Sequence, residues 1–76
     1  MSTATIDGTK FRTQSHRRFI FVVRSMPSGK FRTVRRSDSK TTILSVWRKT
    51  GRGFVLDQAT GAVFDSTMDL EAVVAA

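Results

Sequence analysis

The chain has 76 residues, enough for one small domain, and it contains no Cys. The lack of Cys excludes a disulfide framework and thiolate metal ligands, and it agrees with a reducing, cytoplasmic environment. The 13 Lys and Arg against 6 acidic residues give a net charge of +7, which favours a polyanionic partner.

The basic residues are concentrated in the first two thirds of the chain. All 13 lie between Lys10 and Arg52, and nine fall between Lys10 and Arg36, where there is no acid. Residues 53–76 carry four acids and no base, a separation greater than solubility requires. No apolar run approaches the ~20 residues of a membrane span. A membrane-surface segment is the weakest alternative, because such segments are typically amphipathic helices and the basic stretch has the pattern of strands, so no membrane partner is expected.

Residues 1–9 are small and polar, and they predict a flexible arm before a single domain at 10–76. The tetrapeptide Lys-Phe-Arg-Thr then occurs twice, at 10–13 and at 30–33. Each copy holds a ring between two cations, which is the composition of a platform that stacks on bases and binds phosphates. Coincidence in a chain rich in Lys, Arg and Thr is the alternative explanation.

Residues 17–36 are predicted to form a basic β-hairpin. The first half is the most apolar segment of the chain and is rich in β-branched and aromatic residues, which favour strands. Pro27 and Gly29 suit a turn. Every ionisable residue of the segment is basic, so the hairpin supplies both the start of a core and the strongest functional indication.

The hairpin admits two registers that differ by one residue. Pairing of Met26 with Lys30 places Phe21 opposite Arg35. Pairing of Met26 with Gly29 instead places Phe21 opposite Val34 and Val23 opposite Arg32, and a slip of one residue moves side chains to the opposite face. We prefer the first register because it separates core from charge. Its expected core face holds Phe19, Phe21, Val23 and Phe31. Its expected outer face is mixed and suited to a partner, with Ile20, Val22, Val34, Arg24, Lys30, Arg32 and Arg36.

Residues 39–50 are predicted to form a helix, although their β propensity keeps a strand as the alternative. At 100° per residue the apolar side chains fall within one arc. Ser39, or one of the two residues before it, can cap the start, and Gly51 can end the helix in the left-handed conformation. Trp47 is then expected in the core, and base stacking by this ring is the alternative.

Two short strands are predicted next, at 54–57 and 62–65, followed by a final helix that begins at Ser66 or Thr67 and runs toward residue 76. The order ββαββα predicts an α+β fold. We expect a small antiparallel sheet of four or five strands with helix 39–50 on one face. The other face is expected to be wholly or partly open.

The favoured function is a small, non-catalytic module that binds DNA or RNA through phosphate contacts of the basic hairpin. With about six phosphate contacts, affinity would fall by roughly three decades between 50 and 200 mM salt. Phe11 and Phe31, each flanked by cations, are the candidates for base stacking. The full set of candidate residues is Lys10, Phe11, Arg12, Arg17, Arg18, Arg24, Lys30, Phe31, Arg32, Arg35 and Arg36.

The alternative is a small inhibitor or adaptor of the kind that phages and mobile elements encode. It would dock on an acidic or nucleic-acid-handling protein through the mixed apolar and basic outer face. The small size and the lack of catalytic groups motivate this hypothesis. Either protein would act as a monomer or a homodimer.

The residues predict no enzyme activity, cofactor or metal site. The single histidine, His16, lies among polar residues and lacks nearby carboxylates to complete a metal site. Asp57 and Asp65 flank one predicted hairpin, which is the closest approach to a pair of catalytic carboxylates. Both are expected to be solvated hairpin ends.

Overall fold

A computed structural model describes residues 2–6, 8–13, 16–26 and 28–73, without the side chains of residues 2–4, 9 and 11–13. Its main element is a four-stranded antiparallel sheet in the order β4-β3-β5-β6. The strands are β3 (Phe19–Arg24), β4 (Phe31–Ser37), β5 (Phe54–Asp57) and β6 (Ala62–Phe64). Strands β4 and β6 therefore form the two edges of the sheet.

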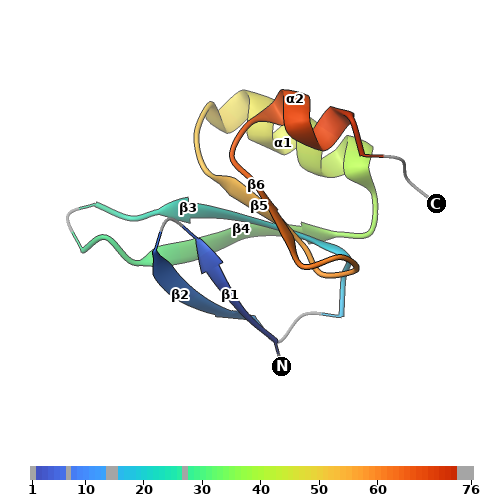
Figure 1. Ribbon diagram of the computed structural model, residues 1–76. Helices are drawn as coiled ribbons and strands as arrows, with labels where there is room; N and C mark the ends of the chain where they lie inside the picture. The colour runs from blue at the N-terminus through green and yellow to red at the C-terminus, as the bar shows by residue number, and fades with distance from the viewer. Residues whose placement is uncertain (1, 7, 14–15, 27, 74–76) are drawn as a thin grey trace.

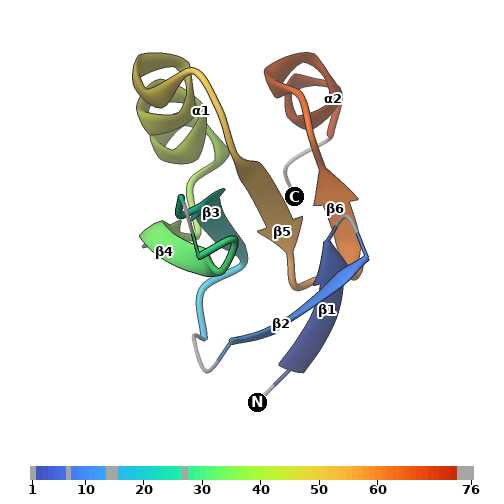
Figure 2. The same ribbon diagram turned by 90° about the vertical axis from the view of Figure 1, so that its left-hand side faces the viewer.

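Two helices, α1 (Lys40–Thr50) and α2 (Thr67–Glu71), lie side by side on one face of this sheet, as Figures 1 and 2 show. A separate two-stranded sheet lies on the opposite side and consists of β1 (Ser2–Ile6) and β2 (Thr9–Thr13). The predicted α+β fold, with its sheet and its two helices, is thereby confirmed. None of the described helices is long and apolar enough to cross a bilayer.

Helix α1 is defined by local sequence signals at both ends. The Ser39 side chain accepts a hydrogen bond from the Thr42 N–H at 3.3 Å and so caps the start. Gly51 adopts a φ of 77° and donates its N–H to the Trp47 carbonyl at 2.8 Å, which ends the helix. The prediction of a helix rather than a strand at 39–50 is confirmed, and Trp47 is buried as expected.

Helix α2 is too short to be stable alone and is held by its neighbours. Ser66 caps its start by accepting a hydrogen bond from the Asp69 N–H, and Leu70 is fully buried. Lys40 Nζ donates to the carbonyls of Glu71 and Val73 at 3.0 and 2.7 Å, so a cation from α1 satisfies the C-terminal end of α2. The expected continuation to residue 76 lies partly outside the described residues.

The two faces of the sheet carry two separate apolar cores. The core on the helix side joins α1 and α2 to the sheet and consists of Phe19, Phe21, Val23, Ile43, Leu44, Trp47, Val55 and Leu70. The core on the opposite side consists of Ile6, Ile20, Val22 and Leu56, with Phe31 and Phe54 packed against it. The central strand β3 supplies alternate residues to each, so both of its faces are buried.

This second core corrects three expectations. Phe31 packs with Ile20 and Val22, so its assignment to the face of Phe19 and Phe21 was wrong. Ile20 and Val22 are fully buried, so they do not form the exposed partner surface that was expected. Instead of an arm at 1–9, the described part of that segment includes strand β1, whose Ile6 is 0% exposed. An uncovered apolar face would cost free energy in water, and Ile6 helps to cover it.

The β3–β4 ladder combines the two registers that the sequence allowed. Its far end follows the preferred register, with Phe21 opposite Arg35. Near the turn it follows the other register, with Val22 opposite Thr33. The register shifts between these two pairs, which leaves Val34 as the extra residue of a β-bulge. A single preferred register was therefore wrong for the half of the hairpin that lies near the turn.

Candidate nucleic-acid interface

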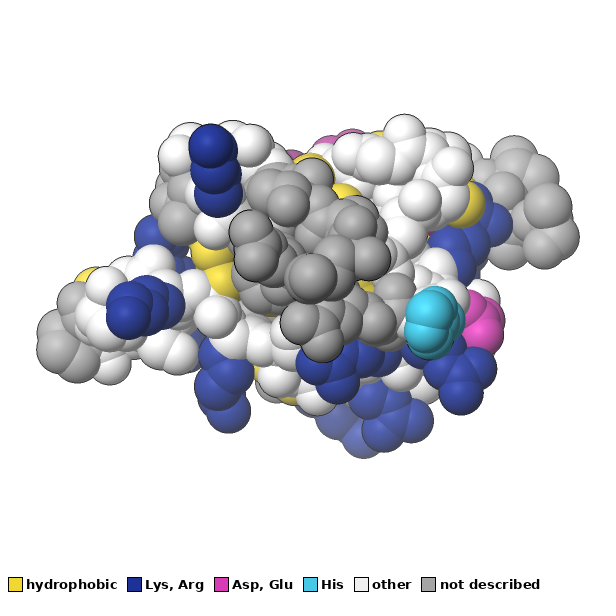
Figure 3. Space-filling model, turned by 90° about the horizontal axis from the view of Figure 1, so that it is seen from below, with side chains coloured by type: hydrophobic (Ala, Val, Ile, Leu, Met, Phe, Trp, Pro, Cys, Tyr) yellow, Lys and Arg dark blue, Asp and Glu magenta, His cyan; other side chains and the backbone are white. Residues whose placement is uncertain are grey.

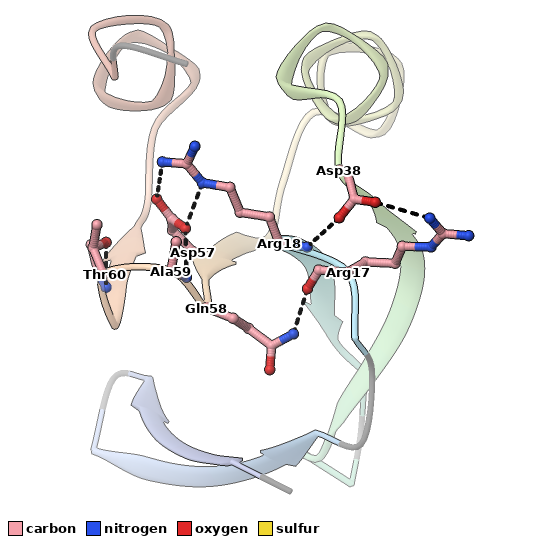
Figure 4. Close-up of polar contacts among 8 residues, drawn as sticks. Arg17, Arg18, Asp38, Asp57, Gln58, Ala59 and Thr60 are labelled. Carbon is pink, nitrogen blue, oxygen red and sulfur yellow. Dashed lines mark hydrogen bonds and ion pairs between the residues drawn. The ribbon is translucent and has the colours of Figure 1, made fainter. Parts of the chain in front are cut away.

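Arg18 belongs to the structural framework of the fold. Its Nε and one terminal nitrogen donate to the two carboxylate oxygens of Asp57 at 3.0 and 3.1 Å (Figure 4). Its guanidinium carbon also lies 4.9 Å from the centre of the Phe19 ring. The Asp57 side chain is only 1% exposed and that of Arg18 is 22% exposed, so this bidentate pair ties the start of β3 to the end of β5 with its carboxylate shielded from water. A nucleic acid would have to break this pair to reach the charge of Arg18.

The ionisation of Asp57 follows from these contacts. Burial by itself would raise the pKa of the carboxyl group. The hydrogen bonds from Arg18 and from the Ala59 N–H outweigh burial, so the pKa of Asp57 lies below its usual range. Asp57 is therefore a charged, buried structural residue. The expectation that it is a solvated hairpin end was wrong.

Arg17 is exposed, but an acid partly neutralises its charge. One of its terminal nitrogens donates to Asp38 at 2.9 Å, and the other oxygen of Asp38 accepts the Arg18 N–H at 2.8 Å (Figure 4). The backbone bond from Arg18, and then the bond from Arg17, lower the pKa of Asp38. These residues line a hollow of about 340 Å³ that also includes the exposed His16. The described residues contain no cluster of three metal-ligating side chains, here or elsewhere.

A contact between the side chains of Arg24 and Phe31 stabilises the hairpin. The Arg24 guanidinium lies 4.5 Å from the centre of the Phe31 ring and donates to the Gly29 carbonyl at 2.7 Å. Phe31 also meets Phe54 edge to face, with ring centres 5.8 Å apart. Arg24 and Phe54 would therefore compete with a base for the Phe31 ring. The hairpin turn itself is closed by two backbone hydrogen bonds of 2.7 Å between Ser25 and residues 29 and 30.

The remaining cations of the hairpin are exposed and lie on or beside the edge strand β4. The side chains of three arginines of β4 make no hydrogen bond or ion pair with any other described residue, and the same is true of the side chain of the lysine just before the strand. These residues, called here the β4 cations, are Lys30, Arg32, Arg35 and Arg36. Figure 3 shows Lys and Arg side chains gathered along one margin of the molecule, at the bottom of the view.

Three predicted residues belong to the N-terminal hairpin. Lys10 is exposed on β2, whose strand partner is β1. Phe11 and Arg12 also lie on β2, but their side chains are outside the described residues. Among the described side chains, the cations of the second Lys-Phe-Arg-Thr copy and of the residues that follow it lie on or beside one strand, whereas Lys10 lies on the separate hairpin.

Sequence reasoning missed the contribution of Arg52. Its guanidinium donates to the Arg24 carbonyl at 3.0 Å and so links the loop after α1 to the end of β3. Nothing local in the Gly-Arg-Gly segment identifies this contact, because the two residues are 28 positions apart. The pair of Arg18 with Asp57 was missed for the same reason, since its partners are 39 positions apart.

Comparisons of the chain with protein-family models, with curated proteins and with solved structures gave no match. The functional argument therefore rests on the chemistry of the described surface.

Proposed function

We propose that this protein is a small, non-catalytic nucleic-acid-binding module whose main contacts join phosphates to the β4 cations. One observation carries the proposal: four positive charges lie exposed along one open sheet edge, without acidic partners among the described residues. The acids that lie near the hairpin, Asp38 and Asp57, neutralise Arg17 and Arg18 instead. A cytoplasmic location is part of this proposal.

The number of free cations sets the expected salt dependence. At most four phosphate contacts, one for each β4 cation, give a slope no steeper than about −3.6 in a plot of log affinity against log salt concentration, so affinity would fall at most roughly 100-fold between 50 and 200 mM salt. This fall is smaller than the sequence alone predicts, because Arg17, Arg18 and Arg24 are held by other parts of the chain. Stacking by Phe11 stays a prediction.

A competing explanation of the same charges is protection of the sheet edge. Exposed edge strands often carry cations that prevent pairing with other chains. If protection were their only role, neutral variants would aggregate and nucleic-acid affinity would not change. The two roles therefore predict different measurements on the same variants.

Fluorescence anisotropy with labelled DNA and RNA, single- and double-stranded, tests the proposal. The variant Arg32→Gln/Arg35→Gln removes two β4 cations, and the control Arg48→Gln/Lys49→Gln removes two exposed cations of α1 at the same net charge. We expect a loss of roughly 30- to 100-fold for the first variant at 0.1 M salt and a much smaller loss for the control. Equal losses would mean that only net charge matters, and no binding by the wild-type protein would refute the proposal.

The adaptor hypothesis expects docking through a mixed apolar and basic outer face of the hairpin, and most of the apolar part of that face is buried. Ile20 and Val22 are buried, and only Val34, 38% exposed, is left of the apolar part of the expected outer face. The hypothesis stays a prediction, and a pull-down from nuclease-treated lysate separates it from nucleic-acid binding. A specific protein retained after nuclease treatment, without direct binding of DNA or RNA, would favour the adaptor.

A further inference from the structure

The β-bulge at Val34 sets the face of the sheet from which each arginine of β4 projects. On the turn side of the bulge, Arg32 lies opposite Val23 of the neighbouring strand β3. On its other side, Arg35 lies opposite Phe21 and Arg36 lies opposite Ile20. Opposed residues of an antiparallel pair project from the same face of the sheet. The pairing therefore assigns a face to each arginine.

Arg32 and Arg35 share the helix side of the sheet. Their partners Val23 and Phe21 both belong to the core beneath α1, whereas Ile20, the partner of Arg36, belongs to the opposite core. A regular strand would do the reverse, because residues four apart share a face and residues three apart do not. Without the bulge, Arg36 would therefore accompany Arg32, and Arg35 would point away.

The bulge also sets the spacing of the pair. Phe21 and Val23 are two positions apart on β3, so Arg32 and Arg35 emerge about 7 Å apart along the sheet edge. Successive phosphates along a nucleic-acid strand are separated by a comparable distance. Bulges at sheet edges commonly redirect a side chain in this way. Both arginines are exposed, and their side chains make no hydrogen bond or ion pair with the described residues. The N–H donors of each guanidinium are therefore available.

We propose that the bulge at Val34 makes Arg32 and Arg35 a seat for two consecutive phosphates of a nucleic-acid backbone, on the helix side of the open edge. Arg36, on the other face, contributes only its distant charge. This inference rests on the proposed function. The seat reads no bases, because the nearest described ring of β4, Phe31, is already packed against Phe54 and Arg24. Binding is accordingly independent of sequence.

Arg35 and Arg36 form a matched pair for the test, since they are neighbours with the same chemistry and both are exposed. Arg32→Gln, Arg35→Gln and Arg36→Gln each leave a net charge of +6, and each is titrated against a labelled DNA duplex at several salt concentrations. We expect the first two to weaken binding roughly five- to tenfold at 0.1 M salt and to reduce the salt slope by about 1. Arg36→Gln should change affinity less than twofold.

Restoring the charge provides a second readout. Arg35→Lys should recover most of the affinity that Arg35→Gln loses, whereas a role of Arg35 in folding alone would show instead as a lower unfolding temperature in both variants. Equal losses at 35 and 36 would overturn the inference and leave the proposed function intact. A loss at 36 with none at 35 would indicate a regular strand and also overturn it. Absence of binding by the wild-type protein would refute the proposed function itself.

Discussion

Asp57→Asn probes the buried ion pair on which the junction of β3 and β5 depends. Asp57 accepts two hydrogen bonds from Arg18 and one from the Ala59 N–H, all within 3.1 Å. Asparagine keeps one acceptor oxygen but turns an amide donor toward the guanidinium. The variant therefore loses a charge-assisted hydrogen bond and buries an unsatisfied donor.

The structure sets the size of the expected loss. Removing one partner of a fully buried ion pair costs about 3 to 5 kcal/mol. The Arg18 side chain is 22% exposed, so water can solvate it in the variant, and the lower end, about 3 kcal/mol, applies. A domain of 76 residues has a total stability of roughly 4 to 11 kcal/mol, so the loss is a large fraction of it. The melting temperature should fall by roughly 12 to 24 °C.

The pH dependence gives the prediction a second test. Because the pKa of Asp57 is lowered in the folded state, the stabilisation is fully present above the ordinary carboxyl pKa of about 4. It is lost as the pH falls through the folded-state pKa. Urea unfolding of wild type and Asp57→Asn should therefore differ at pH 7 and converge toward pH 2.

Asp65→Asn is the control for this experiment, since Asp65 is exposed and has no hydrogen bond or ion pair with the described residues. It should change the free energy of unfolding by less than about 0.5 kcal/mol, as is usual for surface substitutions. This change is at most about a sixth of the loss expected for Asp57→Asn. A loss below about 1 kcal/mol for Asp57→Asn at pH 7, or the same loss at both pH values, would refute the reasoning.

Three further substitutions test the packing. Ile6→Ala removes a fully buried side chain of the second core, so we expect the free energy of unfolding to fall by about 3 kcal/mol and amide exchange in β1 and β2 to become faster. Unchanged exchange would show that Ile6 does not hold this hairpin in place. Gly53→Ala places a Cβ 2.5 Å from the Val22 carbonyl oxygen at a φ of +117°, so it should destabilise the fold by more than 2 kcal/mol in thermal unfolding. Gly61→Ala, with a φ of +77° and open space around it, should lose only about 1 kcal/mol; equal losses would show that the close approach to Val22 does not matter.

Much of the fold follows from short-range signals. The start and end of α1 at Ser39 and Gly51 depend on hydrogen bonds that span three or four residues, and periodicity marks the face that buries Trp47. The strands of the sheet were likewise recognisable from their composition, because β-branched and aromatic residues suit a pleated surface.

The candidate site could be predicted only as a charge class. The sequence shows that the segment from Lys10 to Arg36 is basic, but it does not show which of these charges are neutralised. Arg18 meets Asp57 and Arg17 meets Asp38 through contacts between distant segments, and these contacts leave the β4 cations as the exposed set. Phe31 was misplaced because a shift of one residue in pairing exchanges the two faces of a strand.

By itself, then, the sequence determined the class of fold, the boundaries of α1 and the sign of the charge on the hairpin, because propensity, capping and net charge are local or additive properties. Only the tertiary structure decided that Ile6 helps to cover the second face of the sheet, that Asp57 is buried, and that Val34 forms a bulge. These features depend on segments that meet only after the chain has folded. Competition between two apolar faces for cover, and between two registers for the same turn, is resolved by the packing of the whole domain.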